Sequence, residues 1–133
     1  MVTINRKIRE FSDLDLAFRK NTFTNDITKK LDEEAIKASV KHLILTKNYE
    51  RPFHPEIGCQ IHSLLFENFT PTIKIAMEKT IYETIEKFEP RARILDINVT
   101  DSSDINGLNV SITFQIGNID QPVTVNTVLT RAR

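Results

Sequence analysis

The sequence predicts an α+β fold in which about three N-terminal helices pack on a C-terminal antiparallel meander of three strands, preceded by a short N-terminal strand or arm. Apolar residues recur at helical spacing from Leu31 to Phe88, and at a spacing of two from Ile94 onward. The links DSSDING and GNIDQP are short and rich in turn-forming residues, which favours antiparallel pairing of successive strands. Because 133 residues is the size of one domain, we expect an extended arm over residues 1–30 and a single domain over residues 31–133.

Three segments carry helix signals. In LDEEAIKASVKHLILTKN, Asp32 is the expected N-cap, acidic residues follow in the first turn, and the helix is expected to end near Asn48. The segment GCQIHSLLFENF predicts a short helix of two to three turns. The longest helix is expected in FTPTIKIAMEKTIYETIEKFEP, where Thr70 is the N-cap, Pro71 takes the first helical position and Pro90 ends the helix.

The strand segments are ILDINVT, GLNVSITFQIG and QPVTVNTVLTRAR, and the first alternates through Leu95, Ile97 and Val99. One face of each is apolar, so we expect the helices to cover that face. The terminal strand is expected at a sheet edge, where its backbone can accept a strand from another chain. The alternative is an edge that Arg131 and Arg133 guard against unwanted pairing.

The arm is polar and irregular, with a short alternation through Leu14, Leu16 and Phe18 that predicts a strand. Its phenylalanines, Phe11, Phe18 and Phe23, either pack on the core or are held for a partner.

Composition excludes several classes of protein. The 18 basic and 18 acidic residues balance, which gives no sign of nucleic acid or an anionic membrane as partner and suits a protein that packs inside an assembly. The single Cys59 excludes an internal disulfide and is typical of a chain made in a cytosol. No apolar run reaches the length of a signal peptide or a membrane span.

Catalytic and metal-binding patterns are also absent from the sequence. A glycosidase needs two carboxylates about 5 to 10 Å apart, with one desolvated. The carboxylates in loops or at helix ends are Glu50, Glu56, Glu67 and Glu89. No spacing among them is diagnostic, and His54, Cys59 and His62 offer too few ligands for a structural zinc site. With three glycines in the chain no phosphate-cradling loop is expected, so the sequence predicts no catalytic residue, metal or cofactor.

The segment FEPRAR joins the longest helix to the first strand of the meander. Because Pro90 keeps the backbone out of helix, Glu89 and Arg91 are expected to project from a rigid corner. The corner either docks a partner or forms internal ion pairs with the loop YERPFHPEIG. Those pairs would be Arg51 with Glu89 or Glu50 with Arg91, and both interpretations stay open.

The stretches SDLDLAF, AIKASVKHLILTKNYERPFHPEIGCQIHSLLFENF and FEPRARI, in this order, closely resemble the small baseplate wedge subunits of contractile-tailed phages. These sheath initiators are related to a baseplate component of type VI secretion, and older naming calls them lysozyme-like. The resemblance runs from about residue 12 to the C-terminus. Its most specific parts are Glu50-Arg51-Pro52-Phe53 with Pro55 and Gly58, Leu64-Leu65-Phe66-Glu67, and Glu89-Pro90-Arg91.

The resemblance implies a structural role in the baseplate of a virion tail, assembled in the host cytoplasm, with no reaction catalysed. It implies docking on the helical bundle of larger wedge proteins through Glu89, Pro90 and Arg91, beside Glu50, Arg51, Pro52 and Phe53. It also implies that the first ring of tail sheath protein meets the C-terminal strand at Val123, Val125, Thr127 and Leu129. Hub or tube-proximal proteins are further candidate partners, and the alternative function is a tail-associated hydrolase that degrades peptidoglycan.

Overall fold

The computed structural model describes residues 11–117 and 119–131. The chain forms two compact units, the first ending at Ala38 and the second beginning at Ser39. The boundary between the two units lies inside helix α1 (Asp32–Leu45).

The first unit contains a small antiparallel hairpin. Strand β1 (Ser12–Leu14) pairs with β2 (Lys29–Leu31), with Ser12 opposite Leu31. Asp15 is buried and its carboxylate forms ion pairs with Arg19 at 3.2 Å and Lys30 at 3.7 Å. The described part of the predicted arm is therefore folded on itself, and the strand expected through Leu16 and Phe18 ends at Leu14, where the chain turns.

Helix α1 begins at Asp32, the residue expected as its N-cap, and has three acidic residues in the first turn that complement the helix dipole. It ends at Leu45 rather than near Asn48. The hydroxyl and the backbone N–H of Thr46 both donate to the carbonyl of His42, at 2.7 and 2.9 Å, which satisfies that carbonyl as the chain leaves the helix.

Helix α2 (Ile61–Leu64) is a single turn, so the prediction of two to three turns was wrong. The backbone N–H of Cys59 donates to the carbonyl of Thr46 at 2.9 Å and holds the preceding residues in a loop. The longest helix, α3 (Pro71–Phe88), matches its prediction. Thr70 accepts a hydrogen bond from the N–H of Ile73 at 3.3 Å, and Pro71 takes the first helical position.

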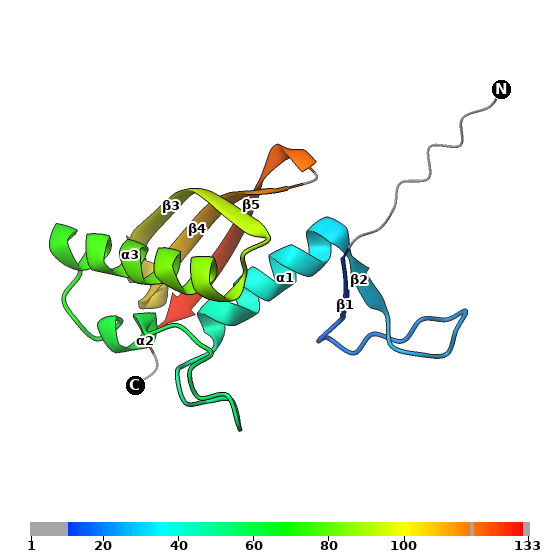
Figure 1. Ribbon diagram of the computed structural model, residues 1–133. Helices are drawn as coiled ribbons and strands as arrows, with labels where there is room; N and C mark the ends of the chain where they lie inside the picture. Colours follow the sequence, from blue (N-terminus) through cyan, green and yellow to red (C-terminus); the bar gives the residue numbers. More distant parts are fainter. Residues whose placement is uncertain (1–10, 118, 132–133) are drawn as a thin grey trace. The chain divides into compact units, whose positions relative to one another are not determined.

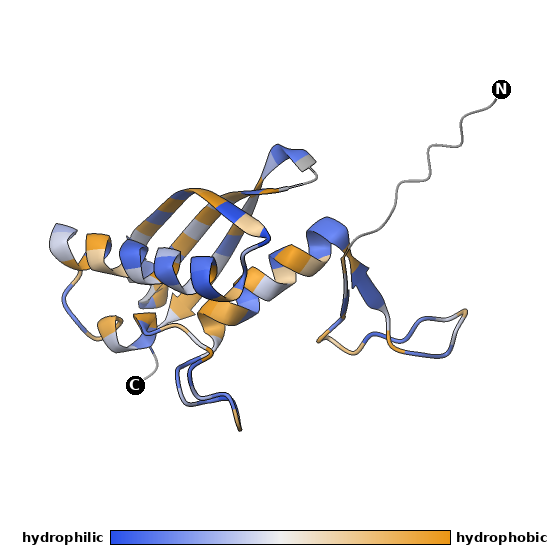
Figure 2. Ribbon diagram, viewed as in Figure 1, coloured by the Kyte–Doolittle hydropathy of each residue, from blue (hydrophilic) through white to orange (hydrophobic). Residues whose placement is uncertain are grey.

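The sheet of the second unit is the predicted three-stranded antiparallel meander, in the order β3 (Ala92–Ser102), β4 (Gly107–Ile116), β5 (Ile119–Thr130). Figure 1 shows α3 running across one face of this sheet. Hydrophobic and hydrophilic residues alternate along the strands (Figure 2), so the covered face supplies the core. Fully buried core side chains include Val40, Ile44, Ile61, Met77, Ile81, Ile85, Leu108, Val110, Ile112 and Phe114.

One strand prediction fails locally. A register shift between Ile94 and Asp96 interrupts the pairing of β3 with β4, and Leu95 is 53% exposed. A bulge inserts an unpaired residue and turns its side chain away from the face that the sequence pattern assigns to it. Val99, farther along the strand, is buried as expected.

Candidate functional site

The corner FEPRAR contains a buried ion pair. Glu89 caps the end of α3 and is only 3% exposed. Its two carboxylate oxygens accept hydrogen bonds from Arg91, Nε to Oε1 at 2.5 Å and Nη2 to Oε2 at 2.7 Å. The hydroxyl of Ser39 on α1 also donates to Oε2. Because Pro90 is exposed and the Arg91 side chain is 35% exposed, the corner presents these two residues and not Glu89 to the surface.

The Glu89 carboxylate is ionised at neutral pH. Burial raises its pKa, but hydrogen bonds from Arg91 and Ser39 and the positive charge of Arg91 outweigh burial and hold the pKa below its ordinary value. A general acid of a glycosidase needs the opposite shift. Glu89 therefore has the environment of a structural carboxylate.

The structure shows neither of the internal ion pairs expected for this corner. Glu89 is paired with Arg91, within the same motif. The Glu50 carboxylate accepts a hydrogen bond from the backbone N–H of Lys47 at 2.8 Å. Arg51 is exposed and forms no ion pair with any residue that the structure describes. Ser39, which sequence reasoning missed, lies 50 positions before Glu89 and carries no local signal of this contact.

The loop between Lys47 and Cys59 is ordered by its own backbone. The N–H of Tyr49 donates to the carbonyl of Pro55 at 2.9 Å, and the N–H of Glu50 donates to the carbonyl of Lys47 at 3.2 Å. In Figure 1 the loop projects away from the sheet. Pro52 and Phe53 are fully on the surface, as are Glu50 and Arg51, so all four loop residues that sequence analysis assigned to a partner are accessible.

The ends of the loop lie beside helix α3. A small cavity of about 180 Å³ is lined by loop residues and by the C-terminal half of α3, up to Lys87 and Phe88. Hydrogen bonds to the Glu56 backbone and to His54 lower the pKa of Glu56 in the loop, and the positive charge of Lys87 lowers it to a smaller extent. The ends of the Pro-rich loop therefore lie beside the last turns of α3, which lead into FEPRAR.

Strand β5 has an open edge. The N–H of Arg131 donates to the carbonyl of Asn106 at 2.9 Å, and the ladder with β4 continues from Thr130 opposite Gly107. In an antiparallel ladder alternate residues direct their backbone groups toward the partner strand. The residues whose backbone groups point away from β4 are Thr124, Asn126, Val128 and Thr130. Within residues 11–117 and 119–131, no strand pairs with that edge.

The four residues predicted to face a sheath protein have buried side chains. Val123, Val125, Thr127 and Leu129 all point into the core, with exposed fractions of 7% or less. A partner on this strand would meet its backbone edge and the alternate side chains of the outer face. Two cross-strand hydrogen bonds order that face, Ser111 to Asn126 at 2.8 Å and Thr113 with Thr124 at 3.1 Å.

The opposite edge of the sheet is protected. The backbone N–H of Val99 points away from β4 and is met by the carboxylate of Glu78 on α3 at 3.4 Å. Lys74 of the same helix donates to the side chain of Asn98 at 3.0 Å. With the bulge near Leu95, these contacts cover part of the β3 edge, whereas Lys41 and Leu45 of α1 line a cavity with Asn126, Thr127 and Val128 beside the β5 edge.

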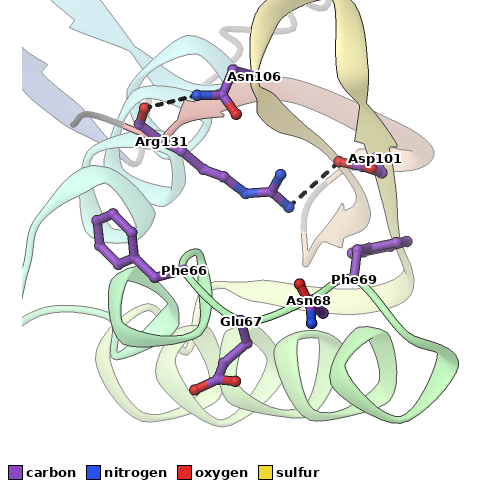
Figure 3. A pocket seen from close by; sticks show the side chains of 7 residues that line it. All are labelled: Phe66, Glu67, Asn68, Phe69, Asp101, Asn106 and Arg131. Carbon is purple, nitrogen blue, oxygen red and sulfur yellow. Dashed lines mark hydrogen bonds and ion pairs between the residues drawn. The ribbon is translucent and has the colours of Figure 1, made fainter.

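A pocket of about 490 Å³ lies where β3 and β5 end (Figure 3). Arg131 crosses it: its Nε donates to the carbonyl of Leu65 at 2.7 Å and its Nη2 lies 3.5 Å from Asp101 Oδ1. Phe66 and Phe69 flank the opening. The guanidinium is committed to holding the last strand against the segment after α2, so the expected guarding role of Arg131 at the strand edge is replaced by a structural one.

The other candidate residues form no reactive centre. Burial raises the pKa of the Cys59 thiol and lowers the pKa of His62, whose ring contacts the carbonyl of Ile44. His54 pairs with Glu56 on the surface. In the part of the chain that the structure describes, no three His, Cys, Asp or Glu side chains gather to hold a metal ion. Nor does any described helix have the length and apolar character needed to cross a membrane.

A buried ion pair behind an exposed corner, an exposed loop and an open strand edge define a structural binding module. The model of the baseplate wedge protein gp25 family matches residues 30–120. The baseplate wedge protein gp25 of Enterobacteria phage T4 is 34% identical over 122 residues, which are 92% of this chain and 88% of the phage protein. The chain belongs to this family: it is a structural baseplate wedge protein of the contractile phage tail type and not an enzyme.

Solved structures share the fold. A chain in the baseplate of the anti-feeding prophage matches with a TM-score of 0.72 and 26% identity, covering 83% of this chain and 88% of that one. A Geobacter sulfurreducens protein that carries the name tail lysozyme matches with a TM-score of 0.69 and 22% identity, covering 75% of this chain and 92% of its own. The second likeness shows the fold alone, so the hydrolase alternative gains no support from that name.

Proposed function

We propose that the chain docks on larger wedge proteins of a tail baseplate and initiates assembly of the tail sheath. The observation that carries the proposal is an exposed docking region together with an edge of β5 that pairs with no strand among the described residues. Membership of the baseplate wedge protein family supports the setting.

For docking, the corner offers Pro90 and the outer part of Arg91. Glu89 holds the Arg91 side chain in place from below, so little conformational entropy is lost when a partner binds it. A guanidinium can meet a carboxylate or the carbonyls at a helix C-terminus, which fits a helical bundle as partner. Glu50, Arg51, Pro52 and Phe53 extend the region along the loop.

For sheath initiation, the backbone edge of β5 accepts a strand from a sheath subunit. Main-chain hydrogen bonds at Thr124, Asn126 and Val128 provide affinity, and the outer-face side chains provide specificity. These side chains are uncharged, which favours burial under a partner over permanent exposure to water.

The docking role is tested by co-expressing the tagged chain with the other wedge proteins of its own particle and separating complexes by size. Arg51→Glu reverses an exposed charge that has no ion pair among described residues, so the fold should survive and complex formation should fail. Lys20→Glu, a charge reversal at another exposed residue, in the first unit, is the matched control. Recovery of the Arg51→Glu complex at the wild-type level would count against the docking region.

The sheath role is tested with Val128→Pro. Because the N–H of Val128 points away from β4, proline removes an edge donor without breaking the ladder. We expect baseplates that contain the variant but fail to seed sheath polymerisation in electron micrographs, whereas Val128→Thr seeds normally. Sheaths of normal length on Val128→Pro baseplates would refute the strand assignment.

A further inference from the structure

Two aromatic side chains on the loop Lys47–Cys59 are exposed to an unusual degree. Phe53 is 97% exposed and Tyr49 is 84% exposed. In Figure 2 the tip of this loop is hydrophobic between hydrophilic stems. Large apolar side chains held in water are costly to leave unburied, and aromatic residues are the residues most enriched among binding hot spots.

Both residues also have a backbone conformation that favours other amino acids. Their φ angles are +66° for Phe53 and +67° for Tyr49, in the left-handed region where Asn and Gly are preferred. The loop is held there by hydrogen bonds from Tyr49 to Pro55 and from Ile57 to His54, at 2.9 and 3.2 Å. An aromatic residue in this conformation gains no internal packing in return, because its ring lies in water. The conformation serves to present the rings.

We infer that Phe53 and Tyr49 are the aromatic anchors of the docking region and insert into an apolar pocket with a carboxylate at its rim on another wedge protein. The inference rests on the proposed docking function and deepens it. The rim carboxylate follows from Arg51, which is exposed between the two rings in sequence and has no ion pair among the described residues. The two ends of the loop line a cavity together with residues of α3 up to Phe88, two positions before Pro90.

Substitution of Phe53 or Tyr49 by asparagine distinguishes an anchoring role from a structural role, because the first predicts weaker binding and the second predicts lower stability. Phe53→Asn and Tyr49→Asn relieve the backbone, so each variant should melt at the wild-type temperature or above it. Binding to the purified wedge complex of the same particle should weaken about 30-fold for Phe53→Asn and about 10-fold for Tyr49→Asn. Ile75→Asn, at another exposed apolar residue on α3 about 18 Å along the helix from Lys87, should change affinity less than about 3-fold.

A photo-crosslinking amino acid at position 53 identifies the occupant. The expected product joins residue 53 to an apolar segment of a wedge protein with an Asp or Glu nearby. Wild-type affinity of both asparagine variants, or a crosslink to a second copy of this chain, would overturn the inference and leave the proposed function standing. A wild-type chain that binds none of the wedge proteins would overturn the proposed function, and the inference with it.

Discussion

At the residue scale, burial changes what a charged motif can do. Glu89 lies under the corner and is bonded to Arg91 and to Ser39 of α1. Its carboxylate joins the end of α3, the start of β3 and α1 through a single side chain. In the proposed docking role Glu89 acts through the position of Arg91, and its replacement should affect stability first.

The first prediction concerns Glu89→Gln. The variant keeps the side-chain shape but loses the charge that Arg91 meets, so the free energy of unfolding at pH 7 should fall by about 2 kcal/mol. Denaturant unfolding of wild type and variant measures the difference. Glu86→Gln, on the exposed face of α3, should change stability by less than about 0.5 kcal/mol.

The same pair predicts a pH dependence. The pKa of Glu89 is lower in the folded chain than its ordinary value of 4.5. The contribution of the pair is therefore fully present above that ordinary value and is lost as the pH falls through the folded-state pKa. The stability difference between wild type and Glu89→Gln should shrink below pH 4.5. An undiminished difference in strong acid would show that the loss has another cause.

A second residue-scale prediction concerns Gly58. Its φ is +152°, and an added Cβ would lie 2.7 Å from the backbone carbonyl of Lys47, which cannot move cheaply. Gly58→Ala should lower the free energy of unfolding by about 2 kcal/mol. Gly117→Ala is the control, since nothing lies within 4 Å of the added Cβ there. Equal stability of the two variants would mean that the loop adjusts without strain.

At the element scale, helix α3 carries the strongest sequence signals, and its N-cap gives a third prediction. Thr70→Ala removes the acceptor for the N–H of Ile73 and should cost about 1 kcal/mol. Thr70→Ser keeps the acceptor and should stay close to wild type. Thermal melting of the two variants checks this, and equal losses would show that the methyl group matters more than the cap.

Elements with local signals were predictable from the sequence. The cap and prolines of α3 and the alternation of β4 are written in neighbouring residues, and both elements match their predictions. The length of α2 could not be predicted, because a tertiary hydrogen bond from Cys59 to Thr46 limits it. The exposure of Leu95 could not be predicted either, because a bulge in β3 causes it. The spacing of apolar residues in the sequence indicates neither the short length of α2 nor the bulge in β3.

The candidate site divides in the same way. Its position at FEPRAR and YERPFHPEIG could be located from prolines and charges close together in sequence. The partners of Glu89 could not be predicted, since the sequence analysis offered Arg51 and not Arg91, and Ser39 is remote in sequence. Likewise, alternation placed the apolar residues of β5 on the face that the helices cover, although the resemblance implied that the same residues meet a sheath protein. Burial assigns that face to Val123, Val125, Thr127 and Leu129.

At the scale of the whole second unit, the C-terminal residues belong to the fold as well as to the edge. Leu129 is 2% exposed in the core, Thr130 pairs with Gly107, and Arg131 fastens the strand to the carbonyls of Asn106 and Leu65 through its backbone and side chain. Deleting these residues removes the buried side chain of Leu129, the pairing of Thr130 with Gly107 and the hydrogen bonds of Arg131 at the same time.

The last prediction follows for truncations. Deleting residues 129–133 should abolish cooperative unfolding of the second unit, because a buried Leu alone contributes about 2–5 kcal/mol, a large part of the stability of a small domain. Arg131→Ala should cost about 1–2 kcal/mol, since it removes the side-chain donor to the carbonyl of Leu65 in a partly buried hydrogen bond. Circular dichroism melts of both variants test this. If the truncated chain unfolds cooperatively at the wild-type temperature, the end of β5 is dispensable for folding. If the truncated chain no longer unfolds cooperatively, a truncation that lacks sheath shows only that the second unit is unfolded. The test of strand addition is then an edge substitution such as Val128→Pro, which leaves the ladder with β4 intact.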